Sequence, residues 1–432
     1  MKAPSYLPWL VLGLLVRLAY VVLTGPDYLL QGDAGYYYTE AQAVSQGHLP
    51  DTYWPPGLPL LAGFFLWVAG PSPYAVFGGM MLIYALTTWL IQKALETENL
   101  WRAAAWVHAV WALYPSCIHH SCAPLSQLPA ALLLLAMYLM FRKMLLSRTR
   151  GPAFFYGLMA GLALLVRPAS LSLSGFMVAR WGYYDFPKGI KALPALVLGG
   201  IMIVFPWQSM VYAKIGKLLP VNEANGYNLF IGNNPWTPLY HTWQLGSHDL
   251  RDDPAYTGFY VLRDSILALP RPERQAAWAY EARRHITQRP DLFLLRSLSR
   301  ALTFCAFDTY AGSNLLSVSR LWGIFFLLAD AFFFCLILCP AIAAWTLRLP
   351  GPEAVPAYIV AYALPYLLVF SHPTYHLPLI PLCMLSAAAA FEARSSLRLR
   401  EILKNRKFRF AALVFALIQA IWILGMAGRL AG

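Results

Sequence analysis

Long apolar segments alternate with short polar ones along most of this chain. An apolar segment of about 20 residues is long enough to cross the hydrocarbon core of a membrane as a helix. On this criterion we expect roughly eleven transmembrane helices, with the region 153–182 the hardest to divide. The predicted spans lie at 7–25, 74–94, 102–118, 124–142, 153–167, 169–182, 190–212, 318–341, 355–371, 375–392 and 409–427.

Two longer polar stretches divide this series of apolar segments. They lie at 26–73, after the first predicted span, and at 213–317, after the seventh. We therefore expect an all-α membrane protein in three parts. An N-terminal transmembrane module (1–212) contains the first external loop (26–73), a large external loop follows (213–317), and a C-terminal transmembrane module ends the chain (318–432).

Composition changes this picture only by excluding a soluble protein. Hydrophobic residues make up 59% of the 432 residues and charged residues 12%, and the mean hydropathy is +0.52. A soluble domain has about 45–50% apolar and about 25% charged residues. The net charge of +13 fits contact with anionic lipids. No separate basic domain is visible, so we expect membrane lipids and no nucleic acid as partners.

Basic residues gather in the loops that would face one side of the membrane. Lys93, Arg102, Arg142 and Lys143 are examples, and the segment 394–409 is densely basic, whereas 26–73 contains no Lys or Arg. Because basic loops stay in the cytoplasm, we expect a cytoplasmic N-terminus and external loops at 26–73 and 213–317. The expected location is a bacterial inner membrane, with any active site on its non-cytoplasmic face.

The first external loop contains a short helical pattern that begins with an acidic residue. Ala34, Tyr37, Ala41 and Val44 recur at helical spacing, which predicts a helix from Asp33 to about Ser45. A carboxylate is favoured at the start of a helix. Glu40 lies two turns after Asp33, on nearly the same face. The pair could share a divalent cation, or both carboxylates could simply be solvated; no other cofactor is expected.

The motifs of this loop resemble a known family of membrane enzymes. They read Asp-Ala-x-x-Tyr-x-x-x-Ala from Asp33 and Pro-Pro-Gly-x-Pro-Leu from Pro55, with Gly47 between them. This resembles the first external loop of polytopic GT-C fold glycosyltransferases, the relatives of dolichyl-phosphate-mannose protein mannosyltransferases and lipid A aminoarabinose transferases. The resemblance implies that Asp33 is the catalytic carboxylate and that the donor is a sugar linked to a polyprenyl phosphate.

Three further segments carry the same resemblance. The run Asn-Gly-x-Asn-Leu-x-x-Gly-Asn-Asn-Pro starts at Asn225, Arg167 precedes a proline, and Tyr-x-x-Pro-x-x-Pro starts at Tyr375. The resemblance and the side-chain chemistry together give Arg167 and Arg17 as contacts of the donor phosphate. The predicted substrate contacts are Tyr37, Glu40, Asn225, Asn228, Asn233, Asn234, Tyr375 and His376.

The sequence departs from the family pattern at two positions. Gln127 stands where relatives often have Glu, and Thr374 stands where they often have Arg. His376 or an arginine of the large loop could replace the missing guanidinium. Arg17 lies inside the first predicted span and needs a partner there, which would be a lipid phosphate or a structural contact within the bundle.

The expected function is sugar transfer from a lipid-phosphate donor to a protein, lipid or glycan acceptor, with Asp33 as general base. The competing prediction is a transporter or a flippase of lipid-linked glycans. Transporters place ionisable residues near the middle of the membrane and are built from paired halves. Here most charges lie at the ends of the predicted spans and no internal repeat is visible, which favours the enzyme.

Overall fold

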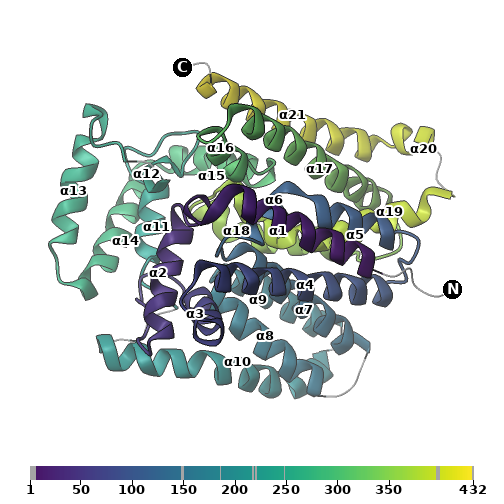
Figure 1. Ribbon diagram of the computed structural model, residues 1–432, viewed down its shortest axis with the longest axis horizontal. Coiled ribbons are helices and arrows are strands. Elements are labelled where there is room, and N and C mark those ends of the chain that lie inside the picture. Colours follow the sequence, from purple (N-terminus) through teal and green to yellow (C-terminus); the bar gives the residue numbers. More distant parts are fainter. Residues whose placement is uncertain are drawn as a thin grey trace.

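The computed structural model describes residues 6–146, 150–184, 186–216, 218, 221–247, 249–395 and 399–430 (Figure 1). These residues form helices and connecting loops and contain no β-strand. The predicted all-α fold class is thereby confirmed. Residues 1–5, whose side of the membrane the sequence predicts, lie outside the described residues, as do 396–398 of the basic segment 394–409.

Seven helical segments in the described part of the chain are long and apolar enough to cross a membrane, which makes this a multi-pass helical membrane protein. They correspond to seven of the predicted spans. They are α1 (Leu7–Leu29), α4 (Pro73–Thr97), α7 (Gln127–Leu146), Lys191–Ile215 within α10 (Phe186–Ile215), α17 (Arg320–Leu347), η2 (Pro373–Leu379) with α19 (Ile380–Glu392), and Arg406–Met426 within α21 (Arg406–Leu430).

The other four predicted spans form shorter helices, so a total of eleven remains a prediction. The segment 102–118 becomes α5 (Ala104–Leu113) and α6 (Pro115–His120), because the chain is extended at Tyr114 and Pro115 starts a new helix. The remaining three are α8 (Gly151–Val166), α9 (Ser170–Tyr184) and α18 (Val355–Leu368), which have 16, 15 and 14 residues. Pro168 separates α8 from α9.

The long helices divide into inner and outer ones. In the most apolar stretch of Pro373–Glu392, 83% of the residues are buried inside the protein, against 17% in Leu7–Leu29 and in Arg406–Met426. Large apolar side chains such as Val22 and Leu23 project outward from α1. A lipid environment accounts for this exposed apolar surface, because a soluble protein would bury it. The inner helices α7 and α19 therefore form the framework behind the candidate site.

The polar loops form a second, mostly amphipathic layer at one end of the long helices. The predicted helix of the first loop is confirmed as α2 (Asp33–Ser45), with Ala34, Tyr37 and Ala41 buried as the spacing requires. It is followed by the apolar helix α3 (Gly57–Ala69). The large loop forms α11 (Asn225–Gly232), α12 (Gln244–Ser247), η1 (Pro254–Tyr256), α13 (Thr257–Leu267), α14 (Arg271–Gln288), α15 (Pro290–Cys305) and α16 (Tyr310–Leu316).

Figure 1 places α2, α11, α13 and α14 together at the end of the molecule where α1 finishes. The opposite end holds the start of α1 and the short helix α20 (Leu399–Lys404), next to η3 (Ala393–Ser395). The two loops that the sequence assigns to the same side of the membrane thus meet in space. Backbone bonds join them directly, since Glu223 N–H donates to Thr52 O at 2.9 Å and Ala224 N–H to Tyr53 O at 3.1 Å.

Candidate functional site

Asp33 is the first residue of α2, and its carboxylate is exposed at the end of the helix bundle. Gly32 precedes it with a φ of 59°, a left-handed conformation that glycine adopts without strain and that turns the chain from α1 into α2. Within the described part of the chain, the carboxylate of Asp33 has no hydrogen-bond partner and no ion pair. It is thus an accessible acidic group that the fold does not use for its own stability.

The surroundings of Asp33 nevertheless remove much of its hydration. This desolvation raises the pKa of Asp33 above its usual value, while the positive charge of Arg167 acts in the opposite direction. Protein atoms therefore lie close around the Asp33 carboxylate without covering it. A raised pKa also makes a carboxylate a stronger base, which suits proton abstraction.

Arg167 reaches the same neighbourhood from the end of α8. The residue is extended, with a φ of −146° and a ψ of 105°, because Pro168 stops the helix. Its Nε donates to Ser126 Oγ at 3.0 Å, Nη1 donates to Tyr366 Oη at 3.4 Å, and the guanidinium lies 4.8 Å from the ring centre of Tyr375. Arg167 is 9% exposed and forms no ion pair with an acidic side chain of the described residues. It is a fixed positive charge that can accept an anionic partner.

Tyrosine rings enclose the space between Asp33 and Arg167. Tyr37 lies one turn after Asp33 on α2, and burial, followed by the charge of Asp33, raises the pKa of its hydroxyl. Tyr310 approaches from α16, with its hydroxyl 3.4 Å from the position a β-carbon on Gly32 would take. Burial and then the Asp33 charge raise the pKa of Tyr310 to about 12. Both hydroxyls are therefore neutral hydrogen-bond donors close to the Asp33 carboxylate.

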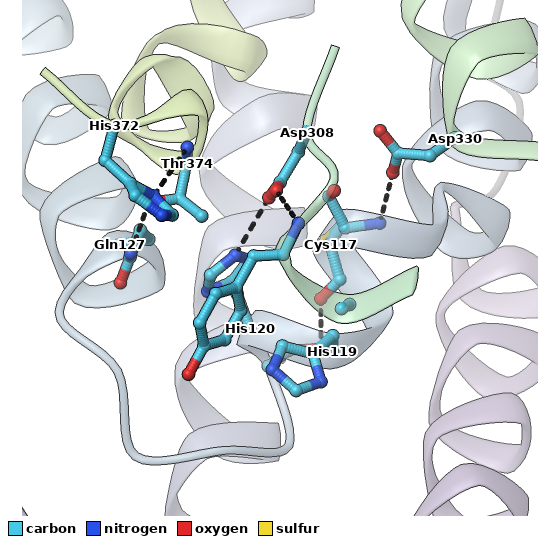
Figure 2. Close-up of polar contacts among 12 residues, drawn as sticks. Cys117, His119, His120, Gln127, Asp308, Asp330, His372 and Thr374 are labelled. Carbon is cyan, nitrogen blue, oxygen red and sulfur yellow. Dashed lines mark hydrogen bonds and ion pairs between the residues drawn. The ribbon is translucent and has the colours of Figure 1, made fainter. Parts of the chain in front are cut away.

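A buried set of histidine contacts supports Tyr310 from behind (Figure 2). His120 Nε2 donates to Asp308 Oδ2 at 3.1 Å, and the backbone N–H of Tyr310 donates to Asp308 Oδ1 at 2.7 Å. Burial alone would raise the pKa of Asp308, but these two hydrogen bonds hold it well below the usual value. The ring of Tyr310 stacks on His120, with centroids 6.3 Å apart. Asp308 thus fixes the start of α16.

Gln127 and Thr374, the two positions at which the sequence departs from the resemblance, touch each other. Gln127 Nε2 donates to Thr374 Oγ1 at 3.1 Å, and His372 Nδ1 lies 3.0 Å from the same oxygen (Figure 2). A carboxylate at 127 and a guanidinium at 374 would carry opposite charges. Here both side chains are neutral, and both are buried. This neutral pair therefore places no unpaired charge in the interior, where one would cost several kcal/mol.

The asparagines of the large loop have two different roles in the structure. Asn233 and Asn234 are buried; Asn233 accepts from Arg300 Nη2 at 2.9 Å, and Asn234 Oδ1 accepts from the backbone N–H of Thr237 at 2.9 Å. Asn225 is exposed and donates to Asn222 O at 3.2 Å, and Asn228 is half-buried. Substrate contact remains a prediction for all four, and the exposed Asn225 and half-buried Asn228 are the accessible pair.

Three further predicted site residues lie in settings of their own. Arg17 is fully buried and donates to Ser121 Oγ at 2.5 Å and to Ala112 O at 2.9 Å, with its guanidinium 3.4 Å from the ring centre of Tyr84. His376 is buried, 4.8 Å from the ring centre of Phe334. The protein thus supplies partners for the Arg17 guanidinium and covers His376, whereas it leaves Asp33 accessible.

Glu40 lies outside a separate hollow but contacts Asp51, one of its lining residues. It accepts from the backbone N–H of Asp51 at 2.6 Å, which ties α2 to the loop that follows it. No cluster of three His, Cys, Asp or Glu side chains suited to a metal ion occurs among the described residues. A cation shared by Asp33 and Glu40 would therefore need ligands from the substrate or from water.

That hollow, which we call the outer pocket, has a volume of about 480 Å³. It lies between α2, the loop after it, and helices α11, α13 and α14 of the large loop. Tyr36, one turn after Asp33, is part of its wall. The lining residues are Tyr36, Asp51, Tyr53, Glu223, Tyr227, Arg263, Leu267, Arg271, Arg274, Gln275 and Trp278.

The sequence pattern thus singled out Asp33, Tyr37, Arg167 and Tyr375 from three distant segments, and the fold brings all four residues together. It missed Tyr310 and the Asp308–His120 pair, although a lone aspartate after the apolar run at the end of α15 was a visible signal. It also missed the outer pocket, which forms only when two loops meet. Comparisons with protein-family models, with curated proteins and with solved structures find no match to this chain.

Proposed function

We propose that this protein is a membrane glycosyltransferase that takes a sugar from a polyprenyl-phosphate carrier and transfers it to an acceptor on the non-cytoplasmic side. The observation that carries the proposal is that Asp33 and Arg167 lie close enough for the charge of Arg167 to lower the pKa of Asp33, although the two form no ion pair. Among the described residues, the Asp33 carboxylate is accessible, has a raised pKa and has no partner, and the nearly buried Arg167 guanidinium has no acidic partner. Both lie where the polar loops meet the apolar helices.

The chemistry of sugar transfer needs a base and a phosphate-binding cation at such a place. Asp33 would take the proton from the acceptor hydroxyl or amine as it attacks the anomeric carbon of the donor. The bond from this carbon to the phosphate oxygen breaks, and the polyprenyl phosphate leaves with the bonding electrons. Arg167 would stabilise the negative charge that grows on this phosphate in the transition state. Tyr37 and Tyr310 offer hydroxyl groups to the sugar between them.

The competing function is that of a transporter or flippase, and one observation favours it. Asp330 is buried within α17, and in the described ranges only one of its carboxylate oxygens has a hydrogen-bond partner, the backbone N–H of Ser116 at 2.8 Å. An acidic residue inside a membrane span often belongs to an ion or proton pathway. Asp33 and Arg167, by contrast, lie at helix ends, where a lipid phosphate would be found, and this location favours the enzyme.

Replacement of the proposed base tests the proposal directly. Asp33→Asn should lower transfer of radiolabelled sugar from a polyprenyl-phosphate donor by about 10²–10⁴-fold in the purified protein. Its unfolding free energy at neutral pH should be no lower than that of wild type, because the side chain makes no contact that Asn would lose and the raised pKa makes the ionised Asp33 unfavourable for folding. Asp27→Asn is the matched control, since Asp27 is an exposed acid nearby at the end of α1. It should keep full activity.

Two outcomes would reject the enzyme. If Asp33→Asn transfers sugar as fast as wild type, Asp33 is not the base. If the wild-type protein moves a lipid-linked sugar across reconstituted vesicles but never releases it from its carrier, the protein is a flippase.

A further inference from the structure

The outer pocket carries more positive charge than its own acidic residues neutralise. Arg271 already forms ion pairs with two carboxylates: Nε donates to Glu223 Oε2 at 2.9 Å and Nη2 donates to Asp51 Oδ1 at 2.6 Å. These two carboxylates are the only acidic groups among the lining residues. Arg263 and Arg274 line the same space. The described wall therefore holds three guanidinium groups against two carboxylates.

Among the three arginines that line the outer pocket, Arg274 is the one without an acidic partner in the described part of the chain. Its Nε donates to Leu269 O at 2.9 Å, which fixes the side chain at the start of α14. Arg263, in contrast, binds the neighbouring Asp264 at 3.0 Å. Because Arg274 is half-buried and held in place, it offers a preorganised contact for an anionic group.

Aromatic rings form a continuous wall beside this charge. Tyr53 and Tyr227 lie 6.4 Å apart between ring centres, and Tyr227 and Trp278 lie 5.2 Å apart. Tyr36 adds a fourth ring from α2. Flat apolar faces with polar edges bind the C–H face of a pyranose while side groups bind its hydroxyls. The volume of about 480 Å³ lies in the usual range for a small-molecule site.

The pocket lies beside the candidate catalytic residue, along a single helix. Tyr36 and Asp33 are three residues apart on α2, which corresponds to about 4.5 Å of helix rise. The ring of Tyr36 also contacts that of Tyr37, with centroids 5.9 Å apart, and Tyr37 belongs to the group around Asp33. A molecule in the outer pocket could thus extend one of its groups toward Asp33.

We propose that the outer pocket is the acceptor site and that it takes an acidic sugar, one that carries a carboxylate or a phosphate. The sugar ring stacks on the wall of Tyr53, Tyr227 and Trp278, and its anionic group binds Arg274. The role of the pocket as an acceptor site rests on the proposed function, sugar transfer. The binding chemistry itself follows from the residues of the pocket.

Binding of small probes to the purified full-length protein tests the inference without catalysis. The probes are glucuronate, mannose 6-phosphate, mannose and uridine diphosphate. The binding of each probe is measured by saturation-transfer NMR. Both acidic sugars should bind at least about tenfold more tightly than mannose, because a charged group gains a hydrogen bond to Arg274. Which of the two binds better tells a carboxylate from a phosphate acceptor.

Arg274→Gln should remove this tenfold preference for acidic sugars. Tyr227→Ala should weaken the binding of glucuronate, mannose 6-phosphate and mannose alike. Arg283→Gln is the matched control, because Arg283 is exposed on the same helix α14 and does not line the pocket. The inference is overturned if no acidic sugar binds, if Arg274→Gln binds like Arg283→Gln, or if uridine diphosphate binds more tightly than the acidic sugars.

The same measurements separate this inference from the proposed function. Asp33→Asn should bind the acidic sugars as wild type does, because Asp33 does not line the pocket. Acidic-sugar binding in a protein that never transfers sugar would leave the pocket assignment standing and reject the enzyme. If the wild-type protein transfers sugar and the Arg274→Gln variant keeps the wild-type KM for the acceptor, the proposed enzyme stands and the pocket assignment is rejected.

Discussion

Gly57→Ala tests the packing that fixes Arg167, and its effect can be worked out from distances. Gly57 is the first residue of α3 and lies against the end of α8. An added β-carbon would lie 2.7 Å from Val166 Cγ2 and 2.9 Å from the carbonyl carbon and oxygen of Leu165. Ordinary contact begins at 3.4 Å, so the backbone of Leu165 must move by about 0.5 Å. Overpacking of this kind costs about 1–3 kcal/mol.

The matched control is Gly78→Ala in the interior of α4. A β-carbon on Gly78 meets no atom within 4 Å, so the methyl group has room. Alanine in a helix interior is about 0.5–1 kcal/mol more favourable than glycine. The free energies of unfolding of the two variants should therefore differ by about 1.5–4 kcal/mol, and Gly57→Ala should be the less stable variant.

The assay is equilibrium unfolding of the detergent-solubilised protein, followed by tryptophan fluorescence. A shift of the Leu165 backbone also moves Arg167 away from Ser126, so Gly57→Ala should raise the KM for the lipid-linked donor and leave the acceptor KM alone. Equal stability of the two glycine variants would refute the packing argument. A normal donor KM in a clearly destabilised Gly57→Ala would refute the link to Arg167.

The remaining predictions concern the two arginines and the base. Arg17→Met should cost about 1–3 kcal/mol in thermal unfolding, because it strips a buried carbonyl of its partner, and should leave the donor KM unchanged; a raised donor KM at unchanged stability would instead make Arg17 a phosphate contact. The acid limb of kcat/KM should lie above pH 3.8, because Asp33 must be ionised and its pKa is raised, and Arg167→Gln should move it to higher pH by removing the charge that lowers this pKa. A limb that stays in place or moves to lower pH would contradict the assignment. The raised pKa also means that Asp33 makes folding less favourable as pH rises from 3.8 through the folded-state pKa, and Asp33→Asn should abolish this slope.

The neutral contact between Gln127 and Thr374 bears on the proposed binding of a donor phosphate. Arg167 is the arginine whose charge acts on Asp33, and Ser126, next to Gln127, positions it through a hydrogen bond. The neutral pair at 127 and 374 adds no second cation. The proposed contact with the donor phosphate therefore depends on one guanidinium, which is why the variants of Arg167 and Gly57 are informative.

The sequence by itself determined the elements of this protein. Apolar stretches of membrane length gave the long helices, because a lipid-exposed backbone must satisfy its hydrogen bonds within the helix. Period 3.6 spacing placed α2 between Asp33 and Ser45, and the proline at 290 divided α14 from α15. These signals are local, so they can be read without knowing where the segments meet. They did not decide how many of the shorter apolar segments cross a membrane.

Only the tertiary structure decided which polar side chains remain available to bind a substrate and which are used in contacts within the protein. Arg17 and Arg167 look alike in sequence, as single arginines in apolar surroundings. In the fold, Arg17 is enclosed by carbonyl and hydroxyl acceptors, whereas Arg167 lies next to the unpartnered Asp33. The outer pocket likewise exists because residues near 51–53 meet residues near 223–278. The reason is physical: desolvation and charge pairing depend on distances between segments far apart in the chain, and no local pattern records those distances.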